Sequence, residues 1–83
     1  MKGHWSKKTT ATFIGKKVRT YYKALKYSDA RIRHIKKHIL DRFIKWMSGQ
    51  TVPVLKNGES GYYSHDVKRF VDLALYGTPT YFD

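Results

Sequence analysis

Two histidines and an aspartate with helical spacing are the first residues that could carry chemistry. His34 and His38 are four residues apart and Asp41 follows three residues later, so on a helix all three share one face. Two imidazoles and a carboxylate are ligands that a divalent metal accepts. However, the neighbouring Lys37 and Arg42 repel a cation, and the motif lacks a third histidine or a flanking glutamate. We therefore expect no metal site and no cofactor.

The same histidines suggest a second chemistry, which is metal-independent cleavage of RNA. One histidine can act as a base and another as an acid, while a Lys or Arg stabilises the charged phosphorane and the RNA supplies the attacking 2′-hydroxyl. These residue types are present as His34, His38, His65, Lys37 and Arg42. Over a few residues, the stretch from His34 to His38, followed by a short predicted hairpin and a capped helix, resembles small bacterial toxin ribonucleases. A ribonuclease toxin using His34, His38 and His65 is therefore the alternative function.

Other enzyme chemistries lack their residues. The chain has no Cys, which excludes disulfides, thiolate zinc sites and a cysteine nucleophile. Its six carboxylates are scattered rather than paired, which disfavours a two-metal nuclease. No glycine-rich phosphate loop precedes a Gly-Lys-Ser/Thr motif. No apolar run is long enough to span a membrane, so we expect a cytoplasmic protein with no membrane contact.

The charge balance points to a polyanionic partner. The 83 residues contain 17 Lys and Arg against 6 Asp and Glu, a formal net charge of +11. Residues 1–56 hold 15 of these cations and 2 acids, whereas residues 57–83 hold 2 cations and 4 acids. The first two thirds of the chain should therefore carry the surface that meets nucleic acid. The last third should serve as a scaffold or contact a protein partner through the aromatic C-terminal segment with Tyr81 and Phe82.

Apolar periodicity predicts the elements that position these charges. A three-four spacing predicts a helix from about Thr10 to Leu25, capped by Thr9 or Thr10. A second helix should begin at the Ser28 cap and end at Gly49, and a third should run from a Ser64 cap to Gly77. Between them, residues 51–55 and 60–63 predict a β-hairpin around Asn57-Gly58. We thus expect a single small α+β domain, mainly helical, in the order helix, helix, β-hairpin, helix, with a flexible basic arm over about residues 1–9.

This arrangement leads to a predicted core, a predicted interface and a predicted function. The protein should be a non-catalytic nucleic-acid-binding protein that contacts phosphates through a long cationic helix, with duplex DNA slightly favoured over RNA. It could be regulatory, or encoded by a phage or plasmid. A basic subunit of a ribonucleoprotein or other large assembly is a further alternative. Exposed aromatic residues such as Trp5 could also stack on unpaired bases.

The predicted core is Ile14, Val18, Ile32, Ile35, Ile39, Phe43, Trp46, Val67, Phe70 and Val71. The predicted contacts are Arg31, Arg33, His34, Lys37, His38, Arg42 and Lys45 on the long helix, with Lys16, Lys17, Arg19 and Lys23 on the first helix.

Overall fold

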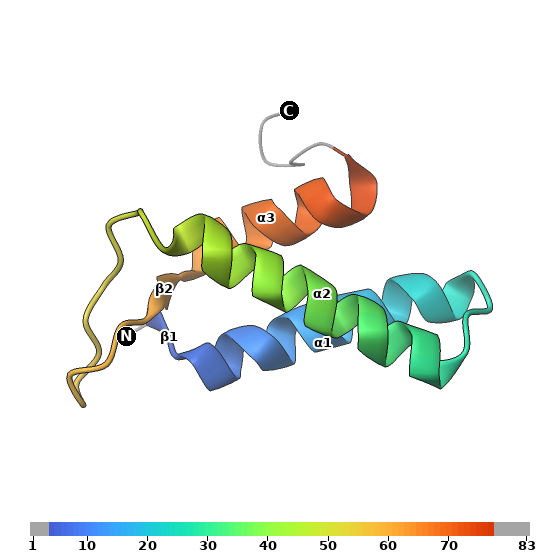
Figure 1. The fold of residues 1–83 in the computed structure, drawn as a ribbon, viewed down its shortest axis with the longest axis horizontal. Helices are drawn as coiled ribbons and strands as arrows, with labels where there is room; N and C mark the ends of the chain where they lie inside the picture. Colours follow the sequence, from blue (N-terminus) through green and yellow to red (C-terminus); the bar gives the residue numbers. More distant parts are fainter. Residues whose placement is uncertain (1–3, 78–83) are drawn as a thin grey trace.

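Two long helices lie side by side, and a third helix packs against both of them (Figure 1). The computed structural model describes residues 4–77. Within that range the order is β1 (His4–Trp5), α1 (Lys7–Ala24), α2 (Asp29–Met47), β2 (Tyr62–Tyr63) and α3 (Ser64–Tyr76). The predicted fold class, a mainly helical small α+β domain, is confirmed. The C-terminal residues Tyr81 and Phe82, predicted to contact a protein partner, lie outside the described residues.

Helix α1 begins earlier than its apolar pattern suggested. The hydroxyl of Ser6 accepts a hydrogen bond of 3.1 Å from the backbone N–H of Thr9, so Ser6 is the cap and the prediction of Thr9 or Thr10 was wrong. Thr10 instead lies fully buried in the core. Residues 4–9, which the sequence assigned to a flexible arm, form β1, the cap and the first turn of α1.

The ends of α2 and α3 confirm two predicted signals and correct two others. Ser28 caps α2 by accepting from the N–H of Arg31 at 3.2 Å, and Gly77 ends α3 in the left-handed conformation with φ 86°. At the end of α2, however, the C-cap is Ser48 in the right-handed region, and its hydroxyl donates to the carbonyl of Lys45 at 2.8 Å. This hydroxyl contact makes the predicted left-handed Gly49 unnecessary. Ser64 is the first residue of α3 rather than its cap, and Tyr63 takes the cap position without a side-chain hydrogen bond.

The predicted hairpin forms its turn but only one bridge of its ladder. Val54 pairs with Ser60 in an isolated antiparallel bridge, and Gly58 adopts φ 86° in the turn. Tyr62–Tyr63 then leaves this partner and pairs with His4–Trp5 in the antiparallel sheet (Figure 1). Pro53, which has no N–H to donate, limits the hairpin ladder. The extended segment before α3 therefore attaches the N-terminal end of the chain to the domain.

All three helices contribute side chains to one apolar core. The predicted core is mostly confirmed, because seven of its ten residues are buried and Ile35 and Phe70 pack against them half-buried. Trp46 is the exception. It is 42% exposed and stacks on Phe70 with 5.3 Å between ring centroids, so it covers the core edge rather than filling it. The buried apolar residues are Ile14, Val18, Ile32, Ile39, Phe43, Met47, Val67, Val71 and Leu75.

Candidate nucleic-acid interface

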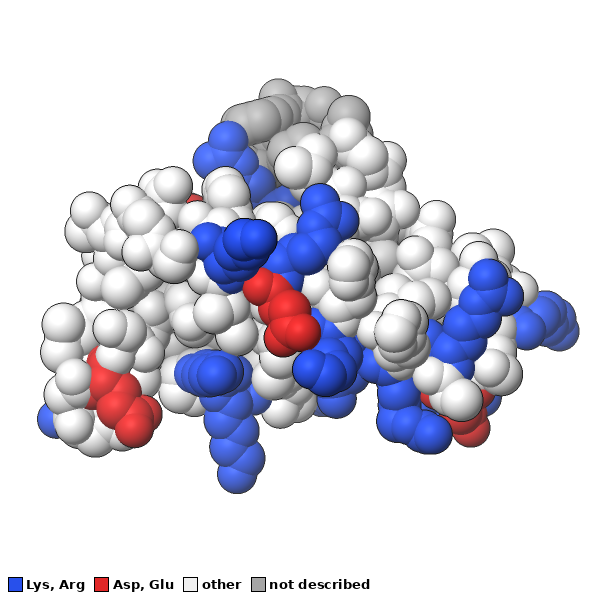
Figure 2. All heavy atoms as spheres, viewed as in Figure 1, with Lys and Arg blue, Asp and Glu red and all other residues white. Residues whose placement is uncertain are grey.

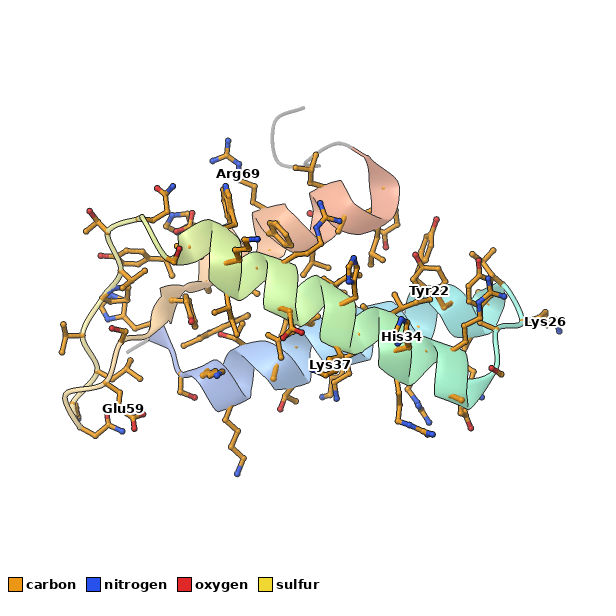
Figure 3. The ribbon with its side chains drawn as sticks, viewed as in Figure 1. Tyr22, Lys26, His34, Lys37, Glu59 and Arg69 are labelled. Carbon is orange, nitrogen blue, oxygen red and sulfur yellow. The ribbon has the colours of Figure 1, made fainter. Side chains whose placement is uncertain are left out.

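The exposed side of α2 carries a continuous row of cationic and imidazole side chains. A helix advances 100° per residue, so the positions away from the buried Ile32, Ile39 and Phe43 fall on one outward face. Lys and Arg side chains gather over α2 and the adjoining edge of α1 in Figure 2, and Figure 3 places His34 and Lys37 near the middle of α2. We call this the outer face of α2. Its exposed members are Arg31, His34, Lys37, His38, Arg42 and Lys45.

Two side chains of the outer face are engaged within the molecule. Lys37 lies 3.4 Å from the carboxylate of Asp41, an exposed i,i+4 pair that contributes little to stability. Arg31 lies over the ring of Tyr27, with its guanidinium carbon 4.4 Å from the ring centroid. A cation–π contact of this kind fixes the direction of the guanidinium without neutralising it. The outer face of α2 therefore stays strongly positive, with Asp41 as the one acid among its cations in the described chain.

A second cationic surface lies between α1 and α2. Lys16 and Arg19 from α1 face Arg33 and Lys36 from α2 across a hollow of about 390 Å³. Thr12, Gly15 and Ile32 complete its lining, so none of the carboxylates within residues 4–77 contributes to it. We call this hollow the α1–α2 groove. Cations held around one hollow raise the local concentration of an anion such as a phosphate group.

Lys36 is the site residue that the sequence analysis missed. In the sequence, Lys36 lies among the apolar residues of the long helix. Its position therefore indicated a break in the apolar face and not a contact with a ligand. In the structure its stem passes over Gly15, and the side chain is exposed in the α1–α2 groove. A lysine can bury its methylenes while its ammonium reaches water. Gly15 was the one sequence feature that could have indicated this placement of Lys36. A residue without a Cβ leaves room for a side chain from a neighbouring helix.

The predicted contacts on α1 divide into three groups. Lys16 and Arg19 line the α1–α2 groove. Lys23 forms an ion pair of 2.9 Å with Asp29 where α1 turns into α2. Its hydrogen bond and its charge lower the pKa of the Asp29 carboxyl below the ordinary value of 3.8, and Arg19 and Arg33 lower that pKa further. Lys17 points to the other side of α1, 5.7 Å from the ring centroid of Phe13. Lys17 therefore lies outside the α1–α2 groove, and its position is shared only with Lys16, which lines hollows on both sides.

Trp5, proposed as a base-stacking group, and the tyrosines at the α1–α2 turn are already packed against other rings. Trp5 packs against Phe13, and Tyr22 packs against both Tyr21 and Tyr27 at 4.8–4.9 Å between centroids. Burial raises the pKa of the Tyr22 hydroxyl, and the two neighbouring tyrosines raise it further. Rings that already contact other rings offer few open faces to bases, which weighs against recognition of single strands by stacking.

The structure does not bring the three histidines of the ribonuclease alternative together. His34 and His38 lie on the outer face of α2, and Figure 3 labels His34 well away from the β2 end of the molecule. His65 lies at that end, in the first turn of α3, where its ring stacks on Tyr63 at 5.5 Å and Nε2 lies 3.5 Å from Asp66. Cleavage by an acid and a base needs both groups at the same phosphodiester. A three-histidine site is therefore not assembled in this conformation.

Across residues 4–77, no three or more His, Asp or Glu side chains are grouped so that they could hold a metal ion. None of the described helices is both long and apolar enough to cross a membrane. Comparison with known protein families, with characterised proteins and with solved structures finds no match to this chain.

Proposed function

We propose that this protein binds nucleic acid without cleaving it, through the outer face of α2 and the α1–α2 groove. The observation that carries the proposal is the convergence of cations from two helices, with Lys16 and Arg19 meeting Arg33 and Lys36 beside the outer face of α2. Each Lys or Arg that neutralises a phosphate releases condensed counterions, which supplies binding free energy that does not depend on sequence. A cytoplasmic location is part of the same proposal.

Duplex DNA is the favoured form of nucleic acid. Helix α2 has 19 residues, and its cations lie on one side of a rod about 28 Å long at 1.5 Å per residue. The major groove of B-DNA admits a helix of this shape, whereas the occupied aromatic rings offer little to unpaired bases. Arg31, His34 and His38 lie in the first half of α2 and are the side chains best placed to reach base edges. The remaining cations would contact the backbone.

Fluorescence anisotropy with labelled duplex DNA and labelled single-stranded RNA over a salt series tests the proposal. We expect tighter binding of the duplex and affinity that falls steeply with salt. The variants R42Q/K45Q on the outer face and R33Q/K36Q in the α1–α2 groove should each reduce the salt slope by about one per lost phosphate contact. The matched control is K56Q/K68Q, which removes the same charge from the loop before β2 and from α3, away from both surfaces.

Three outcomes would contradict the proposal. Loss of affinity in K56Q/K68Q equal to that in the two interface variants would show that only net charge matters. Absence of binding to both probes would mean that the positive surface serves a protein or an assembly partner. A denaturing gel of each sample tests the enzymatic alternative. RNA that is shortened in the presence of EDTA would show metal-independent cleavage and would contradict a purely binding function. In that case H34A and H38A should abolish the shortening.

A further inference from the structure

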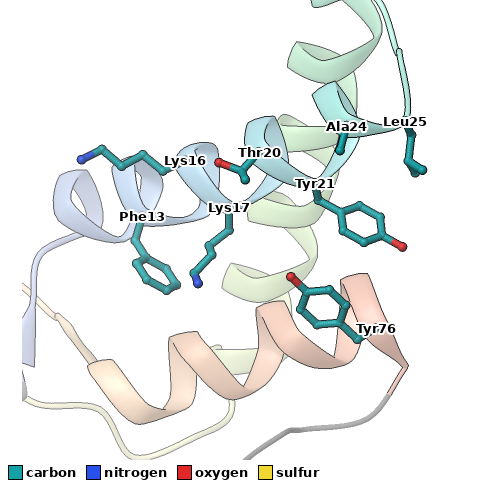
Figure 4. Close-up of a pocket in the computed structure, with 8 residues that line it drawn as sticks. All are labelled: Phe13, Lys16, Lys17, Thr20, Tyr21, Ala24, Leu25 and Tyr76. Carbon is teal, nitrogen blue, oxygen red and sulfur yellow. The ribbon is translucent and has the colours of Figure 1, made fainter.

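An apolar groove runs along α1 from the end of α3 to Trp5 of β1. Its larger hollow, of about 550 Å³, lies between α1 and the end of α3, and Figure 4 shows Tyr21 and Tyr76 meeting there while Phe13 and Lys17 point from α1 toward α3. A second hollow of about 330 Å³ adjoins the first, because Phe13 and Lys16 line both. We call the two hollows together the α1–α3 groove. Its further lining residues are Trp5, Lys8, Thr9, Thr12, Thr20, Ala24 and Leu25.

Large apolar side chains are exposed in this groove. Leu25 is 51% exposed and Tyr76 is 54% exposed, and both line the larger hollow. Phe13 and Trp5, which are half-buried and packed against each other, add two further rings to the lining along α1. Contiguous exposed apolar surface with a polar rim is typical of a site that another molecule covers.

The charged rim of the groove indicates the chemistry of that molecule. Among residues 4–77, the charged side chains that line the two hollows are Lys8, Lys16 and Lys17, with no carboxylate in either lining. An apolar floor with a lysine rim complements an amphipathic helix whose apolar side chains are flanked by Asp and Glu. The 18 residues of α1 extend over about 27 Å, which accommodates a partner helix of about four to five turns.

Two other occupants fit the groove less well. A second copy of this chain would place lysine rim against lysine rim, and each copy carries a net charge of +11. Nucleic acid would need open ring faces or a floor of polar groups. Instead, Tyr21 and Tyr76 meet edge to face at 5.4 Å and 82°, and the floor is apolar.

We propose that the α1–α3 groove binds an acidic amphipathic helix of a partner protein. This proposal does not depend on nucleic-acid binding, because the groove shares only Thr12 and Lys16 with the α1–α2 groove and no residue with the outer face of α2. The protein would then connect a nucleic acid to a second protein through two surfaces that meet at Thr12 and Lys16.

The test uses the full chain and a fluorescein-labelled designed peptide of about 18 residues, with Leu at positions i, i+3, i+4 and i+7 of each repeat and Glu at the other positions. A matched peptide carries Gln in place of Glu. We expect the Glu peptide to bind more tightly than the Gln peptide, and added salt to remove the difference. L25S should weaken binding of the Glu peptide by about fivefold or more, as truncation of an interface anchor does. L73S is the control, since Leu73 on α3 is 48% exposed but lies outside the groove.

A second pair of variants separates this groove from the nucleic-acid surface. K17Q should weaken the Glu peptide and leave the Gln peptide unchanged, while R42Q/K45Q should leave both peptides unchanged. L25S should bind duplex DNA as the unmodified chain does. Retained thermal unfolding midpoints would show that each variant is folded.

Several results would overturn the proposal. Equal loss in L25S and L73S, or equal affinity for the two peptides, would show that no acidic helix is selected at this groove. Binding of the Glu peptide only after deletion of residues 78–83 would identify that segment as the occupant. A dimer in analytical ultracentrifugation that L25S converts to a monomer would identify a second copy instead.

Discussion

The side chain of Lys36 crosses the backbone of α1 at Gly15. A Cβ atom placed on Gly15 would lie 3.1 Å from Cε and 3.3 Å from Nζ of Lys36. This contact lets a lysine from a mostly apolar position of α2 reach the α1–α2 groove, where it joins Lys16, Arg19 and Arg33. A glycine that weakens α1 as an isolated helix thus makes room for a cation at the proposed interface.

The first prediction concerns the stability cost of that glycine. G15A should raise the free energy of unfolding by about 0.5–1 kcal/mol, because alanine is the better helix former and the flexible lysine stem can move by a few tenths of an ångström. Urea denaturation measures the change. In the K36A background, G15A should raise the free energy of unfolding by at least as much as it does in the unmodified chain. The prediction would be wrong if G15A lowered the free energy of unfolding and K36A restored it. That result would show that the lysine side chain cannot move aside.

A second prediction concerns Gly61, where the space is limited by backbone. A Cβ there would lie 2.8 Å from the carbonyl oxygen of Trp5 and 2.6 Å from Cδ2 of Leu55. G61A should therefore lower the free energy of unfolding by about 1–3 kcal/mol, the usual cost of overpacking. G49A is the control, because nothing lies within 4 Å of its Cβ position. Equal thermal midpoints for G61A and the unmodified chain would contradict the prediction. They would mean that β1 and β2 can move apart at Gly61 without lowering the free energy of unfolding.

The third prediction concerns the buried hydroxyl of Thr10. Its side chain is fully buried, and its Oγ1 has no hydrogen-bond partner among the described residues. Replacing that hydroxyl with a methyl group in T10V removes an unpaired polar atom at almost constant volume. We expect a gain of about 1 kcal/mol, which raises the unfolding midpoint by about 4–8 °C for a domain of this size. T20V, at an exposed position of α1, should change the midpoint little.

The fourth prediction is a pH dependence of stability from Asp29. Its pKa in the folded state is below 3.8, mainly through its hydrogen bond to Lys23. As the pH falls, the unfolded chain therefore binds the proton first, so the contribution is fully present above 3.8 and is lost as the pH falls through the folded-state pKa. D29N should lower the thermal midpoint at pH 7 by a small amount, and the difference from the unmodified chain should vanish at acid pH.

The partner residue provides the control for that prediction. K23Q should lower the midpoint at pH 7 in the same direction, and D29N/K23Q should lose less than the two single losses together, because both variants break one ion pair of 2.9 Å. A difference between D29N and the unmodified chain that persisted unchanged into acid would assign the effect to the helix backbone and not to the charge.

The helices and much of the core were predictable because they depend on local spacing. The apolar period of α2 places Ile32, Ile39 and Phe43 on one side, and the structure buries all three. Trp46 has the same kind of position but is exposed, because the edge of the core there is taken by Phe70, on which it stacks. Whether a residue at the margin of an apolar face is covered depends on a neighbouring element, which helical periodicity does not reveal.

By itself, the sequence determined the mainly helical fold, the Ser28 and Gly77 boundaries and the cationic outer face of α2, since caps, periodicity and charge act within a few residues of one another. Only the tertiary structure decided that β2 pairs with β1 and that Lys36 enters the α1–α2 groove over Gly15. It also separated His65 from His34 and placed Lys17 beside the α1–α3 groove. These relationships join residues far apart in the chain, and they depend on how the helices pack in space.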